Sequence, residues 1–152
     1  MNLPPLLVMK RVLLLCSVLV TLVSCQKEDL VKAEAAPYPQ TWKLVKTTGQ
    51  LPGSTRTGAD MVFQETYVFQ ADGTFVKKRQ QGNQALEARG TFSVQHLSDG
   101  PYAVLAYAAA NPIIGSCTQT TWIETLIIKT DDTMVSTWQA CDGPGLEYQK
   151  VK

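Results

Sequence analysis

The stretch Tyr67-Val68-Phe69-Gln70-Ala71-Asp72-Gly73-Thr74-Phe75 has the pattern of a β-hairpin. Aromatic and β-branched residues, which favour extended strands, lie on both sides of Ala71-Asp72-Gly73. Glycine supplies the positive φ that a tight turn requires, and aspartate is common beside it. The stretch therefore predicts two antiparallel strands, 61–70 and 74–80, that are joined directly at this turn.

The same pattern continues in both directions, from residue 40 to residue 152. Turn residues such as Gly, Pro, Asn and Asp separate short runs that are rich in Val, Thr, Ile and aromatic residues. One run, residues 106–110, also suits a short helical turn because it is rich in alanine. The pattern predicts an all-β fold whose sequential antiparallel strands close into a barrel or pack as a sandwich. Besides the hairpin, the expected strands are 41–46, 86–94, 102–107, 120–129, 134–140 and 146–151.

The first 24 residues have the features of a secretory signal peptide. Lys10 and Arg11 precede an apolar run from Val12 to Val23. A run of this length rises about 18 Å as a helix, whereas about 20 residues are needed to span a bilayer. An N-terminal membrane helix is the alternative. The short run and the polar segment that follows it at once favour the signal peptide.

The four residues Leu22-Val23-Ser24-Cys25 resemble the lipobox of bacterial lipoproteins. The resemblance implies cleavage after Ser24, transfer of a diacylglyceryl group to the Cys25 thiol, and N-acylation of the new terminus with a fatty acid such as palmitate. One acyl chain holds a protein to a membrane only marginally, so two or three chains together form a stable anchor. We therefore expect Cys25 to be the lipidated residue that anchors the mature chain.

The residues after Cys25 indicate in which membrane of the cell envelope the protein is expected. Gln26 stands where the family's inner-membrane retention signal has aspartate, which favours the outer membrane, on its periplasmic or cell-surface face. Lys27-Glu28-Asp29 resembles an export signal of some surface-displayed Gram-negative lipoproteins, and an ordinary solvated charge cluster explains it equally well. Residues 25–39 are expected to be the lipidated cysteine and a polar tether, and residues 40–152 a single domain.

Two cysteines remain in the mature domain, Cys117 and Cys141, because Cys16 lies in the apolar run that leaves with the signal. In an exported domain an even pair most simply forms a disulfide. Two free buried thiols are the alternative. The sequence contains no Cys-x-x-Cys pattern that would indicate redox chemistry or a zinc site.

Charge and composition exclude several classes of function. Without Lys10 and Arg11 the mature chain carries 12 basic and 13 acidic side chains, a net charge near −1, which gives no field for nucleic acid. A solvated strand face explains the one basic cluster, Lys77-Lys78-Arg79. The single histidine, His96, lies beside a turn and has no Gly-x-Ser-x-Gly motif to complete a triad. No metal or phosphate motif is present, so we expect neither an enzyme nor a cofactor.

Four segments of this domain form a recognisable set, namely Trp42-Lys43-Leu44-Val45, the 67–75 hairpin, Gly90-Thr91-Phe92 and Leu146-Glu147-Tyr148-Gln149-Lys150-Val151. Together they resemble the small lipocalin-like lipoproteins of bacteria. The resemblance covers residues 40–152 and implies a single antiparallel up-and-down β-barrel of about eight strands, open at one end, with Trp42 at its floor.

Two carboxylates stand on strand faces that are otherwise apolar. Glu65 alternates with aromatic residues and Glu124 with large apolar residues. If these faces point inward, each carboxylate needs a partner inside the barrel, for which Arg79 or Arg89 is available, and it would orient the polar head of a ligand. The favoured interpretation is that a bulge or a rim position leaves both carboxylates in water.

The leading hypothesis is a lipid-anchored, non-enzymatic barrel that binds a small apolar or amphipathic molecule. The small residues Ala88 and Gly90 are expected to widen the interior on one side. The domain is expected to be monomeric. The alternative function is an interaction module whose barrel is filled by its own side chains and which contacts another envelope protein or a glycan. The volume of the interior distinguishes the two functions. The side chains expected to line a ligand site are Trp42, Glu65, Phe69, Phe92, Trp122 and Glu124.

Overall fold

The computed structural model describes residues 37–118 and 120–152. The predicted signal peptide 1–24, the lipidated Cys25 and the residues Gln26 to Asp29 lie outside the described residues. Within the described ranges, no helix is long and apolar enough to cross a membrane. The strands of this part of the chain are β1 (Gln40–Thr48), β2 (Arg56–Thr57), β3 (Gln64–Phe69), β4 (Thr74–Gln81), β5 (Gln84–Leu97), β6 (Gly100–Tyr107), β7 (Ile123–Ile128), β8 (Thr133–Ser136) and β9 (Gly145–Lys150).

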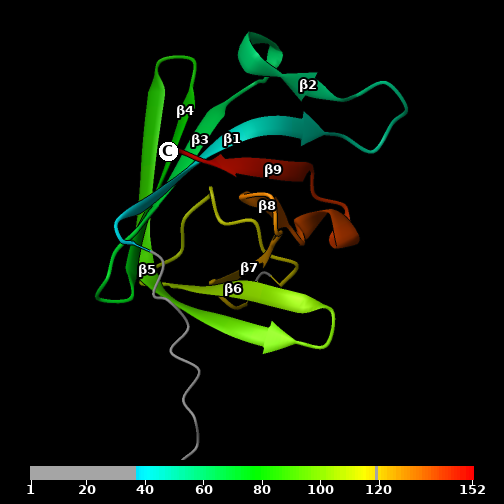
Figure 1. Ribbon diagram of the computed structural model, residues 1–152. Helices are drawn as coiled ribbons and strands as arrows, with labels where there is room; N and C mark the ends of the chain where they lie inside the picture. The colour runs from blue at the N-terminus through cyan, green and yellow to red at the C-terminus, as the bar shows by residue number, and fades with distance from the viewer. Residues whose placement is uncertain (1–36, 119) are drawn as a thin grey trace, which may run out of the picture. The chain divides into compact units, whose positions relative to one another are not determined.

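The strands form one closed antiparallel sheet (Figure 1). From β3 to β9 each strand pairs with the next in sequence, β1 pairs with β3, and β9 returns to pair with β1. The prediction of a single all-β, up-and-down barrel of eight strands is therefore confirmed. The ninth strand, β2, adds a two-residue pairing to the outer end of β1 at Lys46 and Thr47.

The predicted hairpin around Asp72 is present. The backbone N–H of Gly73 donates to the carbonyl of Gln70, and the Asp72 carboxylate accepts a bond from the N–H of Thr74. Gly73 has φ +80°, as a turn of this kind requires. In the expected strand 86–94, which lies within β5, Ala88 is buried between the exposed Glu87 and Arg89, whereas the apolar Leu86 and Val94 are exposed.

Other boundaries differ from the prediction. The strand expected at 134–140 ends at Ser136, and the 3-10 helix η2 (Trp138–Cys141) follows it. The strand expected at 61–70 begins at Gln64, after the 3-10 helix η1 (Gly58–Asp60) and a buried Met61. The helical turn considered for 106–110 does not form, because β6 continues to Tyr107.

The barrel has two ends of different construction. At the tether end, β1 begins after Tyr38, β9 finishes, and three tight turns at 70–73, 98–99 and 129–132 close the wall. At the loop end lie the connections 49–63, 108–122 and 137–144. Successive side chains of a strand point to opposite faces, so one set from every strand fills the space between these ends.

That space is packed with large side chains. Tyr67 contacts Tyr148 edge to face, with ring centroids 5.0 Å apart, and Phe75 contacts Tyr107 in the same way at 4.9 Å. Phe69 packs edge to face on Phe92 at 4.7 Å. Such aromatic pairs are stabilising beyond the area that they bury. The apolar core consists of Trp42, Leu44, Met61, Tyr67, Phe69, Phe75, Ala88, Ala103, Leu105, Tyr107, Ile113, Leu126, Met134, Leu146 and Tyr148.

Candidate functional site

Glu65 and Glu124 lie inside the barrel, each only 1% exposed. The expectation that a bulge or rim position leaves them in water is therefore wrong. Each is the second residue of its strand, Glu65 in β3 and Glu124 in β7, and the strand continues with regular alternation. Neither strand has an irregularity there that would turn the side chain outward.

The partner of both carboxylates is Lys77, whose side chain is fully buried. Its Nζ lies 3.0 Å from Glu65 Oε1, and it donates to Glu124 Oε1 and Oε2 at 3.1 and 3.0 Å. The view of the basic cluster 77–79 as a solvated strand face is thus wrong for Lys77. The signal was its parity, because Lys77 is two residues from Phe75 and points to the same face of β4.

Arg79 is the second cation of the cluster. Its Nε donates to Glu65 Oε2 at 2.5 Å, and its guanidinium lies 4.1 Å from the centroid of the Phe63 ring. Arg89, the other partner considered from the sequence, is exposed and pairs with Glu87 instead. Two carboxylates and two cations leave no formal net charge, which is how a buried ionic group becomes tolerable in an apolar interior.

Two tyrosine hydroxyls complete the hydrogen bonding of the carboxylates. Tyr148 donates to Glu65 Oε1 at 2.6 Å, and Tyr107 donates to Glu124 Oε2. Burial, followed by the charge of Glu65, raises the pKa of Tyr148 well above 10.0. Burial and then the charge of Glu124 raise the pKa values of Tyr107 and Tyr67 as well. The hydroxyls of Tyr107 and Tyr148 are donors to the carboxylates inside the barrel, whereas the buried Tyr67 hydroxyl has no hydrogen-bond partner among the described residues.

Three of the four aromatic residues expected to line a ligand site lie at the tether end. Trp42, Phe69 and Phe92 surround a pocket of about 30 Å³ beneath Tyr38, whose ring lies 6.0 Å from that of Phe92. A volume of this size suits a water molecule or two, not a fatty acid or a retinoid. The structure thus brings these residues together but places little free space between them.

The expected widening beside Gly90 does not occur. A Cβ atom at this position would lie 2.9 Å from the Phe75 ring and 2.0 Å from the carbonyl oxygen of Ala106. The absence of a side chain at Gly90 therefore allows β6 and Phe75 to approach closely, and no cavity results.

The loop end is covered by the connection 108–122. Ile113 is fully buried in the core, and Gly115 approaches Glu124 so closely that a Cβ there would lie 2.7 Å from Glu124 Oε1. Trp122, expected on the inward face, is 47% exposed because β7 begins only at Ile123. The connection fills the mouth of the barrel, and Trp122 stands at its rim.

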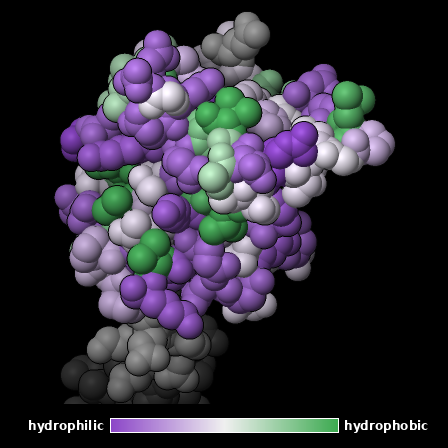
Figure 2. Space-filling model, turned by 90° about the horizontal axis from the view of Figure 1, so that it is seen from above, coloured by the Kyte–Doolittle hydropathy of each residue, from purple (hydrophilic) through white to green (hydrophobic). Residues whose placement is uncertain are grey.

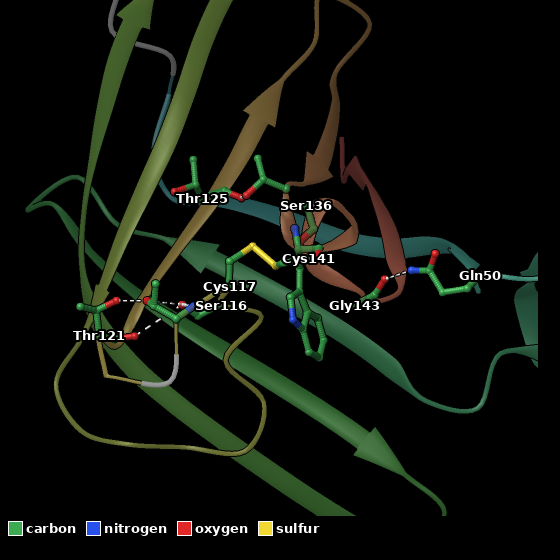
Figure 3. Close-up of a disulfide and its surroundings, with 11 residues drawn as sticks. Gln50, Ser116, Cys117, Thr121, Thr125, Ser136, Cys141 and Gly143 are labelled. Carbon is green, nitrogen blue, oxygen red and sulfur yellow. Dashed lines mark hydrogen bonds between the residues drawn. A yellow bond between two sulfur atoms is a disulfide. The ribbon is translucent and has the colours of Figure 1, made fainter.

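A disulfide between Cys117 and Cys141 fastens this connection to η2, as the sequence predicted, with the two Cα atoms 5.5 Å apart. Figure 3 shows the bridge with Ser116 and Thr121 on the side of the loop and Gly143 beyond η2. The Gln50 side chain donates to the Gly143 carbonyl at 2.8 Å, so the loop after β1 is tied to the same region.

Next to the disulfide is an open groove of about 580 Å³. Its exposed side is Trp122, and its wall includes Trp138, whose indole packs against Gly115 and Gly143. None of the described residues that line this groove has a charged side chain. The hydroxyl and amide groups along it belong to Asn111, Ser116, Thr118 and Thr121.

A second groove, on the wall of the barrel, differs from the first because charged residues line it. This groove of about 360 Å³ crosses β1, β3, β4 and β5. Its lining includes Lys43, Lys78 and Glu87 and also reaches Glu65 and Arg79 of the ionic cluster. Lys78 and Glu87 already pair at 3.3 Å. Figure 2 shows one face of the molecule as mainly hydrophilic, with separate hydrophobic spots that do not merge into a single large patch.

Within the described ranges, no group of three or more His, Cys, Asp or Glu residues is arranged to hold a metal ion. Comparisons with protein-family models, with curated proteins and with solved structures found no match to this chain. Fold and geometry therefore define the protein as a closed eight-stranded β-barrel with an ionic, tightly packed interior and a disulfide-braced groove at one end.

Proposed function

We propose that the chain is a lipid-anchored lipoprotein of the outer membrane whose filled barrel is a rigid scaffold for contact with another envelope component, a protein or a glycan. The single observation that carries this proposal is the ionic cluster of Glu65, Lys77 and Glu124 at the centre of the barrel. The anchor is supported by the lipobox-like sequence that ends at Cys25.

The cluster opposes binding of a small molecule inside the barrel. A ligand that entered the centre would have to separate Lys77 from its carboxylates, and buried charges without partners are strongly unfavourable. Ile113 and Gly115 occupy the loop end, and Tyr38 lies over the small pocket at the tether end. A scaffold needs no such space, because its contacts are made on the outside.

Uptake of a small apolar ligand is the second candidate, because Trp42, Phe69 and Phe92 do line a pocket at the tether end. Outward movement of Tyr38 would enlarge it. This candidate differs from the scaffold in one respect that can be measured, namely a small molecule held by the barrel.

Native mass spectrometry of the protein, extracted gently from its own membrane, tests the choice. The scaffold predicts a mass equal to the processed polypeptide plus its acyl groups. The fragment 26–152 titrated with fatty acids, retinoids and haem should show no saturable quenching of tryptophan fluorescence. A co-purified small molecule, or saturable quenching that Phe92→Ala abolishes, would replace the scaffold proposal with ligand binding.

A further inference from the structure

The groove beside the disulfide has properties that the scaffold role alone does not require. We propose that it binds a neutral saccharide, with the exposed ring of Trp122 as the surface on which a sugar ring stacks. The inference rests on the proposed function and deepens it, because it names the chemical class of the partner.

The first argument is shape. A groove of about 580 Å³ lies within the range of roughly 300–1,000 Å³ that is typical of small-molecule sites. A stable protein interface needs a much broader contact, about 800 Å² on each partner. The concave form of the groove therefore suits a few sugar rings better than the surface of a folded protein.

The second argument is the chemistry of the lining. Described residues of the groove supply two indole rings, hydroxyls and an amide, and none of them supplies a charge. A ligand that carried charge would find no opposite charge there. A saccharide has apolar C–H faces that stack on aromatic rings and hydroxyls that donate and accept hydrogen bonds, as do those of Ser116, Thr118 and Thr121.

The third argument is preorganisation. Thr118 Oγ1 lies within hydrogen-bond distance of both Ser116 Oγ, at 3.3 Å, and Thr121 Oγ1. The Asn111 side chain is fixed by bonds to the Glu87 carbonyl and the Ile113 N–H. The disulfide holds this loop against η2, so a ligand loses little free energy in ordering the site.

Trp122 is fixed in the same sense. Its carbonyl accepts a hydrogen bond of 2.8 Å from the N–H of Tyr107 at the end of β6, so the barrel wall holds its backbone. Its side chain nevertheless remains 47% exposed, beside an exposed Ile123. A large aromatic side chain that is held by its backbone and open to water is the arrangement expected of a stacking surface.

The experiment uses the full lipidated chain in a detergent that has no sugar head group. Chitotriose, cellotriose and maltotriose are titrated separately, and binding is followed by tryptophan fluorescence and by calorimetry. We expect at least one to bind saturably. Trp122→Ala should weaken its binding by about tenfold or more, whereas Trp122→Phe, which keeps an aromatic face, should weaken it by about threefold or less.

Leu97→Ala, at an exposed apolar position of the tether end, is the matched control and should bind as the parent does. Denaturant unfolding of each variant checks that the barrel is intact. The inference is overturned if none of the three saccharides binds, or if Trp122→Ala binds as tightly as the parent.

Two further measurements separate this failure from failure of the proposed function. A photo-reactive group at position 122 that cross-links to an envelope protein in cells, without saccharide binding, would overturn the saccharide inference and leave the scaffold role intact. A small apolar ligand whose binding ignores Trp122→Ala but is lost in Phe92→Ala would instead overturn the scaffold role.

Discussion

At the scale of single residues, the position of Lys77 has the greatest energetic consequence. Its ammonium group pairs with two carboxylates, Glu65 of β3 and Glu124 of β7, and Arg79 supplies the second positive charge that balances them. Replacing a whole buried ion cluster by apolar residues is often neutral, whereas removal of one member leaves uncompensated charge behind. The cluster therefore makes the fold sensitive to this one side chain.

We predict that Lys77→Met lowers the free energy of unfolding by about 3–5 kcal/mol, because Glu65 and Glu124 lose their shared partner. Urea denaturation followed by tryptophan fluorescence measures the change. Lys78→Met is the control, since this neighbour is exposed and its ion pair is a surface one, and we expect stability close to that of the parent. Equal stability of the two variants would contradict the role assigned to Lys77.

At the scale of elements, the disulfide converts two connections into one unit. The loop 108–122 supplies Ile113 to the core and Trp122 to the groove, and η2 supplies Trp138. The bridge between Cys117 and Cys141 joins them across a sequence separation of 24. A closed loop of this size restricts the unfolded chain, which is one source of the stability that a disulfide provides.

We predict that the double variant Cys117→Ser, Cys141→Ser lowers the free energy of unfolding by about 3 kcal/mol. Hydrogen exchange should also increase in residues 108–122 and 137–144, since the bridge is their covalent connection. The strands β3, β4 and β5 are the internal control, and their exchange should change only through global stability. Unchanged stability, or free thiols found at both positions in the folded parent, would refute the prediction.

At the scale of the whole molecule, the three buried tyrosines make the barrel sensitive to alkali. Burial and the nearby carboxylates raise the pKa values of Tyr67, Tyr107 and Tyr148 above the 10.0 of an unfolded chain. A raised pKa means that the folded state holds its proton more tightly than the unfolded state. Their contribution to stability is therefore complete below pH 10 and decreases as the pH rises above that value.

We predict that the buried tyrosines ionise only as the barrel unfolds. In an alkaline titration, most of the rise in phenolate absorbance should coincide with the loss of the circular dichroism of the β-sheet. Tyr102, which is not part of the buried cluster and whose pKa is raised chiefly by its hydrogen bond to Asp99, is expected to ionise before unfolding. Complete phenolate formation in a protein that keeps its β-sheet signal would disprove this account.

The proposed lipid anchor at Cys25 also concerns the whole molecule, and the variant Cys25→Ser tests it. We predict an uncleaved precursor that lacks acyl groups, because the serine hydroxyl cannot replace the cysteine thiol in the transfer. Mass spectrometry of the membrane fraction measures both changes. Cys16→Ser, in the apolar run, should mature normally and serves as the control. Normal maturation of the Cys25 variant would remove the lipobox interpretation.

The sequence by itself predicted most of the strands and the turns that join them. Alternation of apolar and polar residues and the turn residues between them are local properties, so Asp72-Gly73 identifies a hairpin without knowledge of the rest of the fold. The disulfide was predictable for a similar reason, because Cys117 and Cys141 are the two cysteines of the sequence that lie within residues 40–152. The same local pattern also gave a wrong prediction. It extended the alternation of β7 to Trp122 and placed this side chain inside the barrel, whereas β7 begins at Ile123 and Trp122 stands at the rim.

Only the tertiary structure decided whether the barrel is open or filled. The sequence places Lys77 two residues from Phe75, on the same face of β4. Whether a lysine can be buried there depends on Glu65 and Glu124, which are 12 and 47 positions away in the chain. The seating of Ile113 and the approach of Gly115 to Glu124 are likewise contacts between segments far apart in the chain. Burial of a charge is a property of the partners that folding brings to it, and no local pattern of residues contains that information.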